Sequence, residues 1–281
     1  MRVKFIIDSA SDVLPEEALA LGVTLVPMQV AFGEETYEDA VTISHREFYE
    51  KLGQSQALPT TSQINPDTFA QACRPLTENG DSVVIITLSS KLSGTYQSAV
   101  IAAQEYPGKV FVVDSLSATV GQRILLMRGL ELAQQGMDAQ QIAQILEEER
   151  KKIRVAAIID TLEYLKKGGR ISATVAFAGG LLAIKPAVEI LDGEVAMAGT
   201  ARGSKKCHAL LRELIEKHGG VDWSKPMSFV YSGSSDALLQ GFIAETAPLW
   251  EGHAPLPVHS LGSTIGTHIG PGAYGIAFFE K

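Results

Sequence analysis

The chain has 281 residues, of which 46% are hydrophobic and 20% charged, and its formal net charge is −8. This length and composition suffice to bury the cores of one large domain or two ordinary ones, and we expect two. The acidic balance argues against broad nucleic-acid binding, which needs a net basic surface to displace counterions.

Charge is unevenly distributed along the chain. Residues 150–212 hold 12 Lys and Arg against 5 Asp and Glu, a net charge of +7, whereas the rest carries 12 cations and 27 anions, a net charge of −15. A basic segment in an acidic protein indicates a docking face or a phosphate site. Helix faces that are basic only because they are solvated explain it equally well at this point.

Cysteines and apolar runs give no sign of secretion or of a membrane anchor. Cys73 and Cys207 are far apart and fit no metal-binding or CxxC spacing, which favours free thiols in a reducing compartment. The first apolar run, residues 3–7, is too short for a signal peptide. The longest uncharged stretch, residues 171–184, has 14 residues, whereas a membrane span needs roughly 20. We expect a soluble, cytoplasmic protein.

Apolar strands alternate with helices in the first part of the chain. The expected strands cover residues 3–7, 24–27, 83–88 and 110–115, with a hairpin over 30–39. The expected helices cover residues 15–21, 45–52, 66–72 and 121–135, with one that begins at 93 and one that Asp138 caps. This alternation predicts a doubly wound, Rossmann-like domain whose sites lie at the carboxyl ends of parallel strands.

The pattern changes after Arg154. We place a boundary near 153, giving an N-terminal domain over 1–153 and a C-terminal α/β domain over 154–281 with a mixed sheet. Its expected strands cover residues 155–160, 186–191, 194–198, 227–231 and 273–279, with a short one at Val258. Its expected helices cover residues 162–167, 203–218 and 234–247, and 262–272 is expected to be a polar loop. The small, apolar stretch 173–184 is either the wall of an apolar tunnel or a helix packed under the sheet.

A hydroxyl-rich turn follows the apolar run 83–88. The turn spans residues 89–95, and the next helix is expected to begin within it, at Ser93. The first N–H groups of a helix lack intrahelical partners and carry partial positive charge, so Ser93, Gly94 and Thr95 form a seat for an anion. Taken alone, this turn suits a phosphate, a carboxylate or a catalytic serine, and we expect a carboxylate.

Two further loops carry polar side chains that suit the same ligand. Thr61 and Ser62 lie in the loop 59–63, where capping of the next helix is the favoured role and donation of hydroxyls to a ligand is the alternative. Thr267 and His268 lie in the loop 262–272. One anion with an apolar tail would use all three loops and the apolar body around them.

Motifs of the common enzyme classes are absent from the sequence. It contains no P-loop, no GxGxxG after a strand, no HExxH and no GxSxG. Asp8 and Asp12 follow the first strand, but no further metal ligand accompanies them, and hydrogen bonding to the loop backbone is the favoured role. We therefore expect neither a metal nor a cofactor.

Several motifs together resemble the DegV family, in that family's order. They are residues 8–12, Pro59-Thr60-Thr61-Ser62-Gln63, Ser89-Ser90-Lys91-Leu92-Ser93-Gly94-Thr95-Tyr96-Gln97-Ser98, residues 165–171 and residues 267–272. The resemblance implies a two-domain protein that binds one long-chain fatty acid, such as palmitate, stearate or oleate, between its domains. It also implies a non-catalytic subunit of a fatty acid kinase, which presents the carboxylate to a separate ATP-binding subunit that forms acyl phosphate for phospholipid synthesis.

The resemblance assigns roles to individual residues. Thr61, Ser93 and the Gly94 backbone would hold the carboxylate, and His268 would join their hydrogen-bond network. Ile64 departs from the family pattern, which often has Pro there, and this loosens the predicted loop geometry but leaves Thr61 in place. Secondary roles fall to Ser62, Thr95 and Thr267, and contacts at the pocket mouth with the partner or acyl phosphate to Arg170 and Arg202. Transient contact with an anionic membrane surface is a further expectation.

Two alternatives remain open. The first is a serine-dependent acyl hydrolase with Ser93 as nucleophile, His268 as base and Asp8 or Asp114 orienting the ring. We disfavour it because Ser93 is expected at a helix cap without a strained elbow around it. The second is a structural or regulatory module with an empty pocket.

Overall fold

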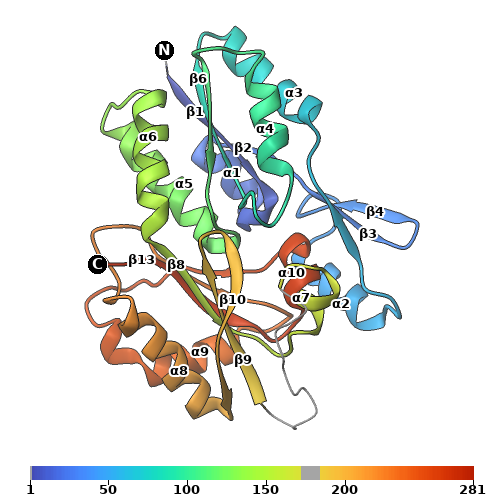
Figure 1. The fold of residues 1–281 in the computed structure, drawn as a ribbon, viewed down its shortest axis with the longest axis vertical. Helices are drawn as coiled ribbons and strands as arrows, with labels where there is room; N and C mark the ends of the chain where they lie inside the picture. Colours follow the sequence, from blue (N-terminus) through green and yellow to red (C-terminus); the bar gives the residue numbers. More distant parts are fainter. Residues whose placement is uncertain (1, 172–183) are drawn as a thin grey trace.

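A parallel sheet forms the first layer of the protein (Figure 1). The computed structural model describes residues 2–171 and 184–281. The strand order in this sheet is β2-β1-β6-β7, and every neighbouring pair is parallel. Its strands are β1 (Val3–Asp8), β2 (Thr24–Val26), β6 (Ser82–Thr87) and β7 (Val110–Asp114).

Helices cover both faces of this sheet, so β6 is buried along its whole length. Val83 and Ile85 pack against α3 and α4, whereas Val84 and Ile86 pack against α1, α5 and α6. The helices are α1 (Pro15–Leu21), α3 (Pro66–Glu78), α4 (Thr95–Ala103), α5 (Thr119–Gln134) and α6 (Ala139–Glu149), with short 3-10 turns η1 (Ser9–Ser11) and η2 (Arg150–Lys152).

A second, mixed sheet has six strands in the order β10-β9-β8-β13-β11-β12. All its neighbouring pairs are antiparallel except β11 and β12. Two helices, α8 (Ser204–Lys217) and α9 (Ala237–Glu245), cover one face, and η3 (Ala247–Leu249) follows them. The strands are β8 (Ile153–Ile158), β9 (Ile184–Leu191), β10 (Glu194–Arg202), β11 (Ser228–Tyr231), β12 (Val258–Ser260) and β13 (Tyr274–Phe279). The predicted two-domain α/β fold class is confirmed.

Helix α5 lies between the two sheets. Its buried residues share one apolar cluster with Phe5 and Ile7 of the first sheet and with Val155 and Phe279 of the second. A helix that is apolar on most sides suits this position, since residues 119–126 of α5 are all buried between the layers. The chain passes to the second sheet where β8 begins, at Ile153, and the division into domains at 153 stays a prediction because the core is shared.

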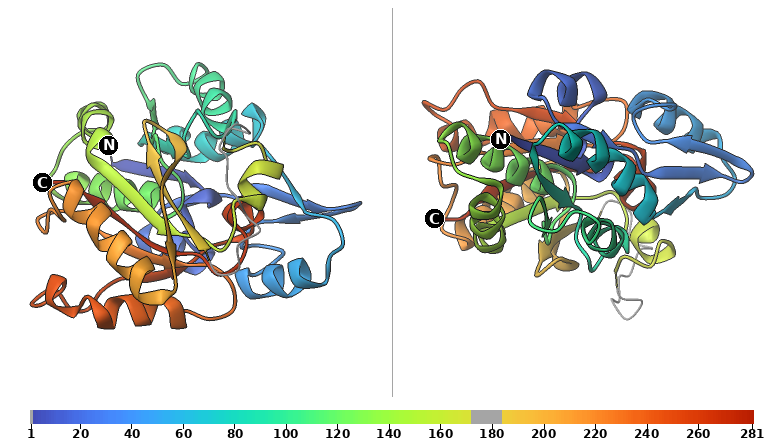
Figure 2. Two further views of the ribbon diagram at one scale, coloured as in Figure 1. Left: turned by 60° about the horizontal axis from the view of Figure 1, so that its bottom comes forward. Right: turned by 90° about the horizontal axis from the view of Figure 1, so that it is seen from above.

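A small antiparallel sheet projects from the side of the molecule, as both views of Figure 2 show. It contains β3 (Gln29–Phe32) and β4 (Glu35–Glu38), which form the predicted hairpin, and β5 (Thr60–Ser62). Helix α2 (His45–Gln54) packs against it through Phe48 and Leu52. Part of the loop predicted over 59–63 is thus a strand. This strand, β5, pairs with an edge of β3 and places Thr61 opposite Val30.

The prediction of a polar loop over 262–272 was wrong for residues 263–269. Residues Ser263–Ile269 form helix α10, next to the short helix α7 (Glu163–Lys167). One glycine and four β-branched residues disfavour an isolated helix of this length, so packing must supply its stability. Gly266 makes that packing possible, since a Cβ there would meet the rings of Phe48 and Tyr49.

Several expectations concern particular segments. Cys73 and Cys207 are free and buried. Of the apolar stretch 173–184, all but Ile184 lies outside the described residues. Within the described ranges, no helix combines the length and the hydropathy that crossing a membrane would demand.

Two glycine-to-alanine substitutions test the packing of the central strands. In Gly275→Ala, the new Cβ would meet the carbonyl oxygen of Ala156 and the side chain of Ala157, so we expect a destabilisation of about 1–3 kcal/mol. Gly53→Ala is the control, because nothing lies within 4 Å of its added Cβ and the site is in α2. Urea unfolding of both should show the control unchanged or stabilised; a Gly275→Ala protein as stable as the parent would contradict the packing described here.

Candidate functional site

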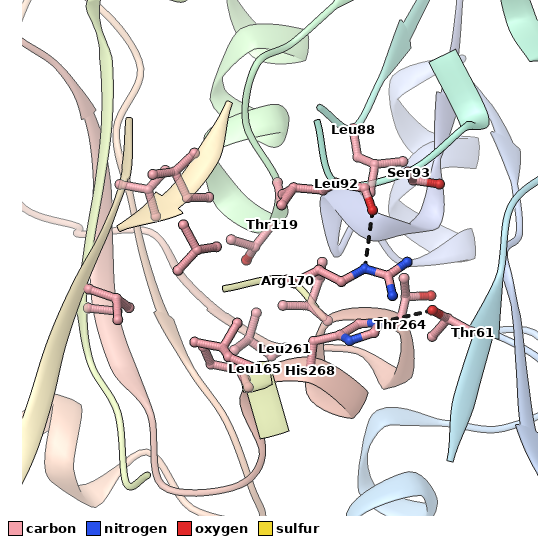
Figure 3. Close-up of a pocket in the computed structure, with 18 of the residues that line it drawn as sticks. Thr61, Leu88, Leu92, Ser93, Thr119, Leu165, Arg170, Leu261, Thr264 and His268 are labelled. Atoms are coloured by element: carbon pink, nitrogen blue, oxygen red, sulfur yellow. Dashed lines mark hydrogen bonds between the residues drawn. The ribbon is translucent and has the colours of Figure 1, made fainter. Parts of the chain in front are cut away.

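A cavity of about 280 Å³ lies between the two domains (Figure 3). Most side chains that line it are apolar and come from the second sheet, from the turn after β6 and from α10. The polar side chains Thr61, Ser93, Arg170 and His268 lie together on one side of it. Apolar walls include Leu88, Leu92, Val155, Val188, Ile190 and Ile265. The cavity therefore suits a ligand with one polar end and an apolar body.

The turn after β6 presents Ser93 to the cavity. Asp8 fixes the start of this turn by accepting a hydrogen bond from the Leu88 N–H at 2.8 Å, as expected for a residue that bonds the loop backbone. Ser89 Oγ, which is buried, donates to the Gly193 carbonyl at 2.7 Å and so ties the turn to the β9-β10 hairpin. These bonds hold the turn from both sides.

Helix α4 begins at Thr95, two residues later than predicted, because Gly94 takes the N-cap position. Ser93 Oγ accepts from the Thr95 N–H at 3.3 Å and lies 3.0 Å from Thr95 Oγ1. Thr95 Oγ1 in turn accepts from the Ile64 N–H at 3.3 Å. The departure at Ile64 thus provides a donor that proline would lack. A Cβ at Gly94 would displace the end of the Gln63 side chain, which lies over it.

Thr61 and His268 are hydrogen-bonded to each other on one side of the cavity. Thr61 Oγ1 lies 2.9 Å from His268 Nε2, which joins β5 to α10. Among the described residues, the other ring nitrogen, Nδ1, has no hydrogen-bond partner; it is buried and lies against Gly168, where a Cβ would collide with it. A proton on Nδ1 would be a buried, unsatisfied donor, so we assign the proton to Nε2, which donates to Thr61. The Thr61 hydroxyl hydrogen is then available to a ligand.

Burial keeps the His268 ring neutral. It lowers the pKa of His268 from 6.5 to about 4, and the nearby charge of Arg170 adds to this shift. Near neutral pH the ring therefore serves as a neutral donor and carries no charge of its own.

Arg170 lies at the edge of the cavity, between the turn after β6 and the end of α7. Its Nε donates to the Leu92 carbonyl at 3.2 Å, and one of its terminal nitrogens donates to the Gly168 carbonyl at 2.6 Å. The side chain is half-buried. Arg170 thus places a positive charge beside the Ser93 turn.

The structure brings together most, though not all, of the residues predicted for the site. Lining the cavity are Thr61, Ser62, Ser93, Gly94, Arg170 and His268. Among the described walls of the cavity, Thr95, Thr267 and Arg202 do not appear. Thr267 donates to the Ser263 carbonyl within α10 at 2.8 Å. Arg202 is exposed at the end of β10, where it pairs with Ile184, away from the hairpin turn that contacts Ser89.

Several cavity residues were missed by the sequence-based prediction, among them the polar residues Gln63, Thr119, Glu189 and Thr264. Thr264 lines the cavity and its Oγ1 is buried without a partner. Gln63 covers Gly94, and its Nε2 lies 3.5 Å from Ser98 Oγ. The hydroxyl pair at 263–264 was a usable signal, but it stood in what was predicted to be a loop. Asp8 and Asp12 accept hydrogen bonds from the backbone N–H groups of Ala10 and Gly262, and no cluster of three or more His, Cys, Asp or Glu suited to a metal occurs among the described residues.

Comparison with known proteins identifies the family. The model of the DegV family, described as uncharacterised proteins, matches residues 2–281. The chain belongs to the DegV family. A DegV domain-containing protein of Deinococcus radiodurans is 36% identical over 278 residues, covering 99% of this chain and 98% of the relative. The Bacillus subtilis protein DegV is 28% identical over 283 residues and is covered completely.

Solved structures of DegV proteins share the fold. A fatty-acid-binding DegV family protein from Thermus thermophilus matches with a TM-score of 0.87 and 35% identity, over 100% of both chains. A stearic-acid-binding protein from Eubacterium ventriosum matches with a TM-score of 0.86 and 28% identity, over 100% of this chain and 99% of the other. These relatives bind fatty acids.

Replacing His268 should flatten the acid side of the stability profile. The pKa of His268 falls from 6.5 in the unfolded chain to about 4 in the folded one. Between these pH values the unfolded chain binds more protons, so stability is lost as the pH falls, by up to about 1.4 kcal/mol per pH unit for one histidine. Urea unfolding across this window should show a smaller slope for His268→Gln than for the parent.

Ser90→Ala, an exposed position with no titratable group, provides the control and should keep the parental slope. Comparison of variant with parent is essential because burial raises the pKa of Asp8 to about 7 and that of Asp12 to about 8. These acids make stability fall as the pH rises, which opposes the histidine contribution. An unchanged slope in His268→Gln would show that the ring is not held neutral.

Proposed function

We propose that the protein binds one long-chain fatty acid in the cavity between its domains, with the carboxylate at Thr61 and Ser93. The observation that carries this proposal is the convergence of the Thr61 and Ser93 hydroxyls on one side of a cavity whose lining is mostly apolar. Relatives described as binding fatty acids, with 35% and 28% identity over essentially the whole chain, support it. Palmitate, stearate and oleate are the ligands we expect.

Two short hydrogen-bond chains prepare the hydroxyls to donate. In one, His268 Nε2–H donates to Thr61 Oγ1, whose hydrogen is then directed to the ligand. In the other, the Ile64 N–H donates to Thr95 Oγ1, which can donate to Ser93 Oγ and release the Ser93 hydrogen. Each hydroxyl both accepts and donates, so neither chain leaves a donor unused. Both chains end at the position of the carboxylate.

Burial of the acyl chain provides enough free energy for tight binding of a fatty acid. Burial of a methylene contributes about 0.8 kcal/mol, so a chain of about sixteen carbons gains on the order of 10 kcal/mol before the costs of binding. A carboxylate is costly to bury unless several donors meet it. Thr61, Ser93 and the start of α4 provide such donors, and charge-assisted hydrogen bonds are the stronger kind.

We further propose that the protein presents the bound carboxylate to a separate ATP-dependent kinase subunit, which forms acyl phosphate for phospholipid synthesis. The sequence contains no P-loop, which supports a division of labour with a separate nucleotide-binding subunit. Arg170 at the cavity edge and the exposed Arg202 would face the partner or the acyl phosphate. The basic segment 150–212 would also support transient contact with an anionic membrane surface.

The hydrolase alternative has less support. Ser93 and His268 share no hydrogen bond among the contacts of the described residues: Nε2 bonds to Thr61, and Nδ1 lies against Gly168. A serine nucleophile needs a base within hydrogen-bond reach. Ser93 instead bonds to the first residue of α4.

Removal of either hydroxyl should weaken binding of the fatty acid. Ser93→Ala and Thr61→Val each leave the carboxylate short of one donor, so we expect a loss of ~1–3 kcal/mol in binding free energy. Ser90→Ala is the matched control, because Ser90 is exposed in the same turn and does not line the cavity. Displacement of a fluorescent fatty acid by palmitate measures all three, and parental affinity in Ser93→Ala would rule out the assigned role.

Substitution of Arg170 or Arg202 should distinguish fatty-acid binding from acyl phosphate formation. We expect Arg170→Ala and Arg202→Ala to retain fatty-acid binding and to reduce acyl phosphate formation by the cognate kinase subunit with ATP. Arg46→Ala serves as control, since Arg46 is an exposed arginine of α2 paired with Glu50. If both variants support full acyl phosphate formation, these side chains are merely solvated.

A further inference from the structure

Two acidic residues from the N-terminal part of the chain hold the start of α10. The Gly262 N–H donates to Asp12 Oδ1 at 2.7 Å. Asp39 Oδ1 accepts from both the N–H and the hydroxyl of Ser263, at 2.8 and 2.6 Å. The N-cap residue Gly262 has no side chain to bond these groups itself. Asp12 and Asp39 thus do what a capping side chain does in other helices.

This contact is enclosed on every side. Asp39 and Ser263 are 0% exposed, and Asp12 is 3% exposed. A Cβ on Gly262 would lie 2.8 Å from His45 Nε2, 2.9 Å from Asp39 Oδ1 and 3.2 Å from Asp12 Oδ1, so no larger residue fits there. The start of α10 is therefore closely packed against the side chains of His45, Asp39 and Asp12.

Burial of the Asp12 and Asp39 carboxyl groups at this position costs free energy of folding. Burial raises the pKa of Asp12 to about 8, the charge of Asp39 adds to the shift, and the hydrogen bonds from Thr119 and Gly262 oppose it. Asp39 Oδ2 is buried without a partner. A fold that retains two buried carboxyl groups side by side departs from what stability alone would favour, and such departures are expected near functional sites.

Helix α10 connects its Asp12 and Asp39 contacts to the cavity. It has seven residues and is too short to be stable alone. Thr264, Ile265, His268 and Ile269 of this helix all line the cavity. A tilt of α10 at its first turn would move the His268 ring, whose bond to Thr61 is 2.9 Å long.

We propose that Asp39, together with Asp12, is a positioning residue for the ligand site. It holds the first turn of α10 so that His268 Nε2 meets Thr61 Oγ1 and directs the Thr61 hydroxyl to the ligand. The interpretation as a fatty-acid site rests on the function proposed above, whereas the positioning of His268 does not. Asp39 acts through His268 and touches no ligand.

A double-mutant cycle tests this proposal. The proteins are the parent, Asp39→Ala, His268→Gln and the double variant, and palmitate displaces a fluorescent fatty acid from each. Asp39→Ala should weaken palmitate binding on the order of tenfold, and by less than about threefold when His268 is already replaced. Asp138→Ala is the matched control, because Asp138 caps α6 through the Gln141 N–H, away from the cavity. It should change the affinity by less than about twofold.

Nitrogen-15 NMR of the His268 ring gives a second readout that does not need a ligand. We expect its ring signals to move in Asp39→Ala and to stay in Asp138→Ala. If Asp39→Ala does not fold, Ser263→Ala replaces it in the cycle, since it removes only the hydroxyl donor to Asp39, and a loss of about threefold is expected.

The outcomes separate the two proposals. A full tenfold loss in the His268→Gln background, or unchanged ring signals in the folded variant, overturns the positioning role. Failure of the parent to bind palmitate overturns the proposed function, and the ring signals then still decide whether Asp39 positions His268.

Discussion

The hydrogen bond between Thr61 and His268 joins residues 207 positions apart, and the polar end of the cavity depends on it. One partner lies on the small sheet that projects from the first domain, and the other lies on a helix inserted before the last strand of the second. Neither element is stable alone, since β5 has three residues and α10 seven. The bond can form only when both domains are folded and packed, so the site is a property of the whole chain.

Neutral groups perform the recognition proposed for this site. Hydroxyls and a neutral imidazole stand at the centre, while the charge of Arg170 stands at the edge and bonds to backbone carbonyls. A fixed cation in contact with the carboxylate would need compensation whenever the cavity is empty, because a buried unpaired charge is costly. Hydroxyls that already bond to one another tolerate both conditions.

Long apolar patterns made most of the fold predictable. The run at 83–88 is rich in β-branched residues and is a buried parallel strand, and the apolar surface of 121–135 belongs to a helix between layers. Thr61, Ser93 and His268 were found because their motifs resemble a known family. Short elements escaped: β5 and α10 are set by tertiary partners, and the contacts of Asp39 or Gln63 depend on chain segments that only folding brings together.

The position of α5 limits how a ligand can enter. This helix belongs to the cores of both sheets, so moving the domains apart would bring its buried leucines and Ile124 into water. At about 25 cal/mol per Å² of apolar surface, such a hinge opening is strongly opposed. The shared core of α5 therefore opposes a hinge opening of the two domains around the cavity. Exchange of a long, flexible molecule must then use local rearrangements of the short elements at the cavity edge, whose free energies of opening are lower than that of the core.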